Sequence, residues 1–335
     1  DNDTFVNGFT VIDYNDSITC HYLKYDHDSK TFTDNTKLGV DGKTTFHKPK
    51  EESDNDLRIY RKAINNIKEI DYPEMNDHFI KGKNDSDEKN VKNSFIFPPI
   101  DKGARYTEDD KENLTLQYII NSPDHTLFLG PQESGKKSLL YRIIVEFVDE
   151  FEIYNKVPVF IDFKEVKNKE FLTIIREYTL LSITEVENLL VKGKFIFLID
   201  NLDYHESKNY IHQINRFHKL NNDYPLNRII ACYEHENIEI LPTELIKHSK
   251  IAFSYQYIRS LRTKEIKLIM KQWLSEDDIS QQENNLEKLV NTFTSYHLPN
   301  NALSIHLYLW SVANSDRKPI NQAVLMEIYI ELIFA

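Results

Sequence analysis

The sequence predicts an α/β protein in which a parallel sheet is covered by helices on both faces. Three observations predict this fold class. From Phe95 onward, apolar runs of strand length alternate with segments of helical period. Some of these runs are continuously apolar, as from Phe195 to Ile199, which is typical of strands buried on both faces. The connections between the runs are long enough to hold helices, and such crossovers join parallel strands.

Residues 1–40 are predicted to be a β-hairpin tail of a preceding domain. Phe9 to Ile12 and Ile18 to Tyr25 have strand composition, and Asn15 and Asp16 between them have turn composition. Two or three strands are marginally stable in water, so we expect them to complete a sheet that begins upstream. The chain also begins with Asp and ends in an apolar run at Ile333 to Ala335, which favours an excerpt of a longer protein.

Residues 41–94 are predicted to be a polar linker that contains one short helix. The helix is expected from Leu57 to Ile70, because Ile59, Ala63 and Ile67 fall on one face at helical spacing. Polar and acidic residues flank this segment on both sides.

Residues 95–258 are predicted to form the α/β core, and residues 259–335 an all-α lid or the start of a C-terminal helical domain. The expected strands of the core are Thr126 to Gly130, Val157 to Phe163, Lys194 to Asp200, Arg228 to Tyr233 and Ile251 to Tyr257. The helices expected between them are Lys136 to Glu150, Glu170 to Tyr178, Ile183 to Lys192 and Glu206 to Leu220. After Arg259 the apolar period is helical to the end of the chain.

The composition restricts the classes of partner and compartment. A net charge of -12 argues against nucleic acid as a standing partner, because phosphate backbones are held by clustered Lys and Arg. No apolar run approaches the roughly 18 residues of a membrane span, so no membrane is expected. The two cysteines, Cys20 and Cys232, are far apart and follow no signal peptide, which argues against a disulfide framework. The expected compartment is therefore the cytoplasm.

The most informative segment joins an expected strand to an expected helix through a glycine-containing loop. Two glycines stand five residues apart, a lysine follows the second directly, and the helix begins at once. In such a loop successive backbone N–H groups converge on phosphate oxygens, the helix N-terminus adds its dipole, and the lysine reaches the β- and γ-phosphates. The predicted nucleotide-binding residues are Gly130, Pro131, Gln132, Glu133, Ser134, Gly135, Lys136, Lys137 and Ser138.

This loop departs from the strict pattern at one position. The pattern requires Ser or Thr after the lysine, where a hydroxyl helps to hold Mg²⁺, and this chain has Lys137 there. An ammonium group has no lone pair for a metal, and Ser138 lies about 100° further around the helix. We therefore expect nucleotide binding to be better preserved than hydrolysis. The alternative is a strand-to-helix turn with incidental lysines.

A second motif lies about 65 residues further on. The apolar run from Phe195 ends in Asp200, and Asp203 follows. Because ligands of open α/β sheets bind at the carboxyl ends of the strands, Asp200 is expected to share an edge with the loop and to hold Mg²⁺. Asp203 is expected to orient an attacking water. The alternative for both residues is that they cap the following helix.

With both motifs in place, residues from about Phe95 to Ala335 resemble the STAND class of P-loop NTPases, which includes NACHT proteins. Gly130 to Ser138 look like the Walker A motif of that class and Phe195 to Asp203 like its Walker B motif. The resemblance implies a five-stranded parallel sheet followed by a helical lid that reports the bound nucleotide. The chain departs from this class at Tyr204, where an acid is common, and at Tyr233 to His235, where a sensor arginine is common.

The first 35 residues also look like the last strands of a calcineurin-like metallophosphoesterase, through Gly8 to Ile12 and the hairpin from Tyr22 to Phe32. The metal-binding signatures of that enzyme class are absent from the sequence. The resemblance therefore implies an upstream effector domain, and no phosphoesterase chemistry in this chain.

Some further residues have candidate roles that are weaker. We expect solvated or hydrogen-bonded side chains, and no metal site, at His205, His212 and His218. We expect Cys232 to be a core residue and not a nucleophile. Tyr106 and Tyr118 are candidates to stack on a base, although packing is the simpler role. Arg228 and Arg259 are candidates to sense the γ-phosphate.

The sequence thus favours an ATP- or GTP-binding regulatory switch of a multidomain signalling or defence protein, with Mg²⁺ as a cofactor. Its partners are expected to be a second copy of the chain or an upstream effector domain in the same polypeptide. The alternative is a degenerate P-loop scaffold, an interaction module that has lost hydrolysis, with or without the loss of nucleotide binding. Whether the chain is an enzyme stays open, because the magnesium and sensor positions are weakened.

Overall fold

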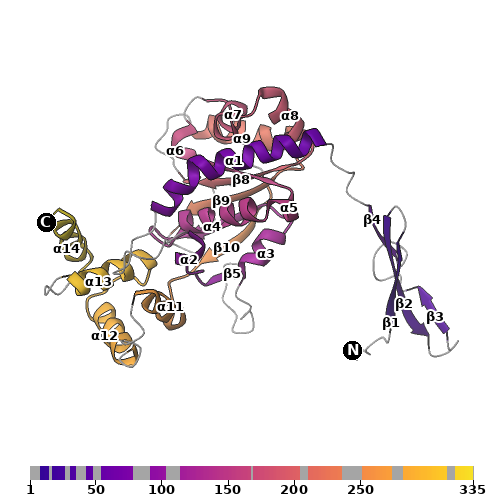
Figure 1. Cartoon of the computed structure of the whole chain (residues 1–335). Coiled ribbons are helices and arrows are strands. Elements are labelled where there is room, and N and C mark those ends of the chain that lie inside the picture. The colour runs from indigo at the N-terminus through magenta and orange to yellow at the C-terminus, as the bar shows by residue number, and fades with distance from the viewer. Residues whose placement is uncertain are drawn as a thin grey trace. The chain divides into compact units, whose positions relative to one another are not determined.

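The computed structural model describes residues 8–14, 17–26, 31–34, 43–47, 54–77, 91–102, 114–166, 169–203, 210–235, 251–273, 282–314 and 321–334. The chain divides into two compact units, Asp1–Arg58 and Ile59–Ala335 (Figure 1).

The first unit contains a four-stranded antiparallel sheet. Its strands are β1 (Gly8–Tyr14), β2 (Ser17–Asp26), β3 (Thr31–Asp34) and β4 (Lys43–His47). One edge of β2 pairs with β1, while the other edge pairs with β4 along its first half and with β3 along its second half. Strand β4 lies in the range that is predicted to be linker. Its sequence has Phe46 as the single large apolar residue, so no apolar alternation predicts it.

The second unit is built on a six-stranded sheet, and the predicted α/β fold class is confirmed. The order of its strands is β5, β10, β6, β9, β8, β7. The five predicted strands are parallel: β6 (Thr126–Gly130), β7 (Val157–Asp162), β8 (Phe195–Asp200), β9 (Arg228–Glu234) and β10 (Ser254–Ile258). The sixth, β5 (Ile100–Lys102), pairs antiparallel with β10 at the edge. Three residues are too few for a periodic signal, so the sequence does not predict β5.

The central strands are buried on both faces. Every residue of β6 and of β8 is buried, and β9 is buried as far as Tyr233. Such complete burial requires cover on each side of the sheet. Figure 1 shows helices around the sheet, which are α3 (Leu116–Asn121), α4 (Lys136–Asp149), α5 (Phe151–Tyr154), α6 (Phe163–Val166), α7 (Phe171–Thr179), α8 (Ile183–Val191) and α9 (Tyr210–Asp223).

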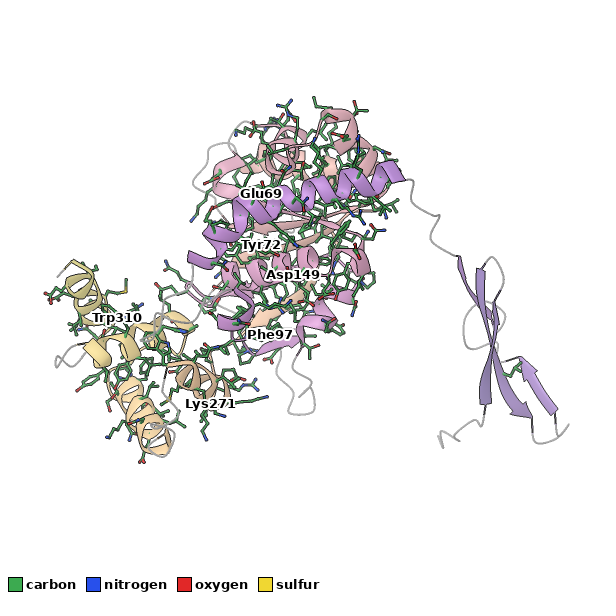
Figure 2. The ribbon with its side chains drawn as sticks, viewed as in Figure 1. Glu69, Tyr72, Phe97, Asp149, Lys271 and Trp310 are labelled. Carbon is green, nitrogen blue, oxygen red and sulfur yellow. The ribbon has the colours of Figure 1, made fainter. Side chains whose placement is uncertain are left out.

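Helix α1 (Asp54–Asp77) is longer than the sequence pattern predicts and is bonded to this core. The three residues predicted on one face, Ile59, Ala63 and Ile67, are all buried. The side-chain amide of Asn66 donates to the carbonyl of Thr179 at 3.0 Å. The hydroxyl of Tyr72 donates to the carboxylate of Asp149, the last residue of α4, at 3.0 Å (Figure 2).

The same carboxylate of Asp149 holds a second segment. Its other oxygen lies 3.1 Å from the ammonium of Lys92, which belongs to the short helix α2 (Val91–Ser94). One acidic side chain at the end of α4 therefore joins α1 and α2 to the core.

The C-terminal part of the second unit is helical, as predicted. It contains α11 (Thr263–Trp273), α12 (Gln282–Ser295), α13 (Ala302–Asn314) and α14 (Gln322–Phe334). Its apolar cluster includes Leu261, Ile269, Trp273, Leu289 and Phe293, and Ile96 from the segment before β5 packs against it. No helix among the described residues is both long and apolar enough to cross a membrane.

Burial of Asp71 on α1 generates a pH-dependent prediction. Burial raises the pKa of Asp71 from 3.8 to about 6, although the nearby Tyr178 hydroxyl lowers it, and the Glu74 carboxylate raises it further. The folded chain therefore binds this proton more tightly than the unfolded chain, so ionised Asp71 destabilises the fold above about pH 6. This cost is relieved as the pH falls from about 6 towards 3.8.

We expect Asp71→Asn to raise the free energy of unfolding by about 1 kcal/mol near neutral pH, with the partial solvent exposure of the side chain taken into account. The gain shrinks towards zero near the ordinary carboxyl pKa. Urea denaturation of both proteins at neutral and at acidic pH measures it. An equal gain at both values would contradict the assignment of this cost to Asp71.

Candidate functional site

The parallel strands bring their carboxyl ends to one edge of the sheet. Gly130 is the last residue of β6 and lies opposite Glu234, the last residue of β9. Asp162, the last residue of β7, lies opposite Asp200, the last residue of β8. Two carboxylates and the glycine-containing loop are thus placed along a single edge, as the sequence predicts for Asp200 and the loop.

The loop between β6 and α4 has a backbone conformation that favours glycine at one position and a close side-chain contact at another. Gly135 has φ +89° and precedes the first residue of α4, so it adopts the left-handed conformation that other residues avoid. At Gly130 a Cβ would lie 2.7 Å from the Ser134 hydroxyl and 3.3 Å from the Cβ of Ile258. The first N–H groups of α4 have no acceptor within the helix and carry its positive dipole end.

The loop opens onto a cavity of about 400 Å³. Seven of the nine predicted loop residues line it, from Gln132 to Ser138, and Asp200, Asn201 and Glu234 line it from the ends of β8 and β9. The opposite wall is largely apolar and comes from Phe95, Ile96 and Pro98 before β5 and from Leu261, Trp273 and Leu303 near α11 and α13. The cavity therefore joins a polar wall rich in N–H groups to an apolar wall.

Lys136, the first residue of α4, bends back onto the loop. Its ammonium donates to the carbonyl of Gly130 at 3.0 Å and to the carbonyl of Pro131 at 2.6 Å. The two predicted loop residues outside the cavity wall, Gly130 and Pro131, thus hold the lysine that the motif provides. A ligand has to compete with these two bonds for the ammonium.

Lys137 turns towards two aromatic rings. Its ammonium lies 5.3 Å from the ring centre of Tyr141 and 5.8 Å from that of Phe160. Burial lowers the pKa of Lys137, but the Tyr141 hydroxyl and the carboxylates of Asp200 and Glu74 outweigh it and raise the pKa above its ordinary value. Lys137 is therefore charged, beside Asp200.

Asp200 is 6% exposed, and Asp162, which is not among the predicted site residues, lies opposite it on the neighbouring strand. Burial raises the pKa of the Asp200 carboxyl, the backbone N–H of Asn201 opposes this, and the neighbouring Asp162 raises it again. The side-chain amide of Asn201 donates to Asp162 at 2.9 Å and to Asp200 at 3.4 Å, so it connects the two carboxylates. Asp162 ends an apolar run just as Asp200 does, and this shared pattern is the signal that would have identified it.

Asp203 has a different environment from Asp200. Its carboxylate accepts a hydrogen bond from the backbone N–H of Glu234 at 3.0 Å. It is not among the described residues that line the cavity, whereas Glu234 is. The bond joins the chain after β8 to the end of β9, and the predicted role of Asp203 in orienting water stays a prediction.

One of the two arginine candidates is at the wrong end of the sheet. Arg228 begins β9, and its guanidinium donates to the carbonyls of Asp124 and Ile120 at 2.9 and 3.0 Å. Burial lowers its pKa to about 10. The prediction that Arg228 senses a γ-phosphate is therefore wrong, because the loop lies at the carboxyl ends of the strands. Arg259 follows β10 on the loop side and pairs with Asp101 at 2.7 Å.

The remaining candidates do not join the site. Cys232 is fully buried, and burial raises its thiol pKa well above the ordinary value, in keeping with a core residue. Tyr118 is 48% exposed and is not among the described residues that line the cavity. Within the described ranges no cluster of three His, Cys, Asp or Glu side chains is arranged to hold a metal. Tyr106, Tyr204 and His205 lie outside the described residues.

No protein-family model matches the chain, and no curated protein matches its sequence. Solved structures match more distantly. The Orc1 protein of Aeropyrum pernix in complex with DNA has a TM-score of 0.40 at 11% identity, over 65% of this chain and 64% of that one. Domain III of the replication initiation protein DnaA of Thermotoga maritima has a TM-score of 0.38 at 14% identity, over 66% and 90%.

The PCH-2 protein of C. elegans has a TM-score of 0.38 at 13% identity, over 64% of this chain and 62% of that one. The match thus spans less than two thirds of the Orc1 and PCH-2 chains. Similarities at these values carry no argument about function, which has to come from the site itself.

The geometry at Gly135 generates a prediction about the loop. An added Cβ at Gly135 meets no atom of the described residues within 4 Å, so the cost of Gly135→Ala is backbone strain without a clash. We expect the free energy of unfolding to fall by about 1–2 kcal/mol, the cost of the left-handed conformation for a residue with a Cβ. Urea denaturation measures this, and a loss well above that range would contradict the absence of a clash.

Proposed function

We propose that the chain is a nucleotide-binding module that holds the phosphates of ATP or GTP at the loop from Gly130 to Ser138. The observation that carries the proposal is the bent loop between a fully buried strand and α4, open to a cavity of about 400 Å³. Seven of the nine residues predicted from the motif, Gln132 to Ser138, line this cavity. A volume of this size is ordinary for a small-molecule site.

The two walls of the cavity suit the two halves of a nucleotide. The N–H groups at the start of α4 and the ammonium of Lys136 are donors for the phosphate oxygens. The apolar wall of Phe95, Ile96, Pro98 and Trp273 suits a base, which has a flat apolar face. We propose that the triphosphate releases Lys136 from the carbonyls of Gly130 and Pro131.

A magnesium ion fits the residues poorly. The position after Lys136 carries an ammonium in place of a hydroxyl ligand, and the amide of Asn201 already connects Asp162 and Asp200. Asp200 remains the residue that would hold the ion, and the ion would supply charge beside the phosphates. The proposal is for binding, and no step of it depends on the ion or on hydrolysis.

We propose further that the module is a regulatory switch whose C-terminal helices respond to the nucleotide. The cavity has walls from the core and from α11 and α13, so a ligand contacts both. Gln322 at the start of α14 also donates to Glu133 of the loop at 3.1 Å. A switch requires that the nucleotide bind one arrangement of these helices more tightly than another. This role is the one implied by the resemblance to STAND proteins.

The partners of the proposed switch follow from the same resemblance. They are an effector domain upstream in the same polypeptide, of the metallophosphoesterase type, or a second copy of the chain. The antiparallel sheet of β1 to β4 is the segment proposed to belong to the effector.

A second candidate function is a scaffold that has lost nucleotide binding. The observation that favours it is the pair of bonds from Lys136 to the loop carbonyls, which satisfy the ammonium without a ligand. The two candidates differ in whether ATP stabilises the folded chain.

Lys136→Ala separates the two functions. If ATP binds, a concentration of a hundred times Kd raises the stability of the parent by about 2.7 kcal/mol. We expect Lys136→Ala to weaken binding of a fluorescent ATP analogue at least about tenfold and so to remove at least about half of this gain. Fluorescence anisotropy and thermal melting measure the two effects.

The matched control is Lys169→Ala. The ammonium of Lys169 lies 2.8 Å from the carboxylate of Glu177, and Lys169 is not among the described residues that line the loop cavity. It should bind as the parent does. A parent that melts no higher with ATP than Lys136→Ala would establish the scaffold.

A further inference from the structure

Lys137 stands between two cavities. It lines the cavity of the phosphate loop and also a neighbouring cavity of about 310 Å³. The second cavity is bounded by Asp71 and Glu74 of α1, by Asp162 at the end of β7, and by the rings of Phe160 and Tyr178. The long flexible stem of a lysine can direct the ammonium into either space.

The surroundings of Lys137 keep its ammonium charged, because the Tyr141 hydroxyl is hydrogen-bonded to it and the carboxylates of Asp200 and Glu74 lie nearby. The rings of Tyr141 and Phe160 lie at 5.3 and 5.8 Å, within the range of a cation–π contact. Such a contact is worth about 0.5–1 kcal/mol at an accessible site, less than a charge-assisted bond to a phosphate. An anion in the loop cavity offers the ammonium a charged partner, which neither the rings nor the neutral hydroxyl of Tyr141 provides.

The carboxylates beside Lys137 are balanced by protein groups. Asp162 and Asp200 lie opposite each other on neighbouring strands, and the side-chain amide of Asn201 donates to both. The ammonium of Lys137 adds an attractive charge to Asp200. A divalent ion would have to displace or tolerate these groups and would find no hydroxyl at position 137.

We propose that Lys137 supplies the positive charge that a divalent ion would supply beside the phosphates, so that nucleotide binding does not depend on a divalent cation. The ammonium leaves the rings of Tyr141 and Phe160 and pairs with the β- and γ-phosphate oxygens on the side facing Asp200. Lys136 binds the phosphates from the loop side, so two adjacent residues of α4 neutralise them together. This inference rests on the proposed function and deepens it.

One substitution should make nucleotide binding depend on a divalent cation. Lys137→Thr removes the ammonium and places a hydroxyl at the position where the motif requires one for Mg²⁺. Its binding of nucleotide should then need the metal. Lys137→Met removes the charge but keeps an apolar stem beside Tyr141 and Phe160, so its fold is better protected and no metal ligand is created.

The experiment measures the Kd of a fluorescent ATP analogue for the full chain by anisotropy, with excess Mg²⁺ and with excess EDTA. The parent is expected to bind within about threefold in the two buffers. Lys137→Met is expected to bind at least about tenfold more weakly in both. Lys137→Thr is expected to weaken in EDTA by a similar factor and to recover in Mg²⁺. The matched control, Lys169→Met, lines the neighbouring cavity and is expected to behave as the parent.

Two results would overturn the inference while leaving the proposed function intact. The first is a parent whose affinity falls about tenfold or more in EDTA. The second is Lys137→Met binding as tightly as the parent in EDTA, with thermal melting showing that both are folded. A folded parent that binds in neither buffer would refute the proposed function and this inference together.

Discussion

The parallel pairing of β6 to β10 determines where the polar groups of this chain gather. Strands buried on both faces cannot hold charged side chains along their length without a large cost, so the charges lie at the strand ends. Because all five strands run in one direction, their carboxyl ends meet at one edge, where Gly130, Asp162, Asp200 and Glu234 come from four separate parts of the sequence. The loop and the acidic residues are therefore neighbours as a consequence of sheet direction.

The sequence predicts the parts of the fold that depend on local pattern. Continuous apolar runs located all five parallel strands, and helical periods located the helices after Arg259. The antiparallel edge strand β5 and the strand β4 were missed, because three residues or one large apolar side chain give no period. The length of α1 was underestimated, since its last turns are bonded to distant residues such as Asp149.

The residues of the candidate site also divide into those that a local pattern predicts and those that depend on distant parts of the chain. The loop was predicted residue by residue, because its chemistry depends on spacing within nine consecutive positions. The role of Asp162 depends on its register opposite Asp200, and the role of Asn201 depends on a bond across two strands. Arg228 is the first residue of its strand, so the carboxyl-end rule that located Asp200 places it away from the loop. Long-range register is the information that a single sequence lacks.

Helix α4 is bonded to two other segments at its C-terminal end. It begins at the glycine-containing loop, and its last residue, Asp149, is bonded to Tyr72 and Lys92. The helix has 14 residues and is about 21 Å long, and the bonds at its last residue oppose sliding along its axis. In the proposed function, a nucleotide would then be accommodated by rotation of side chains in the first turn of α4. The side chains of Lys136 and Lys137 would move on binding, while the backbone of the helix would stay in place.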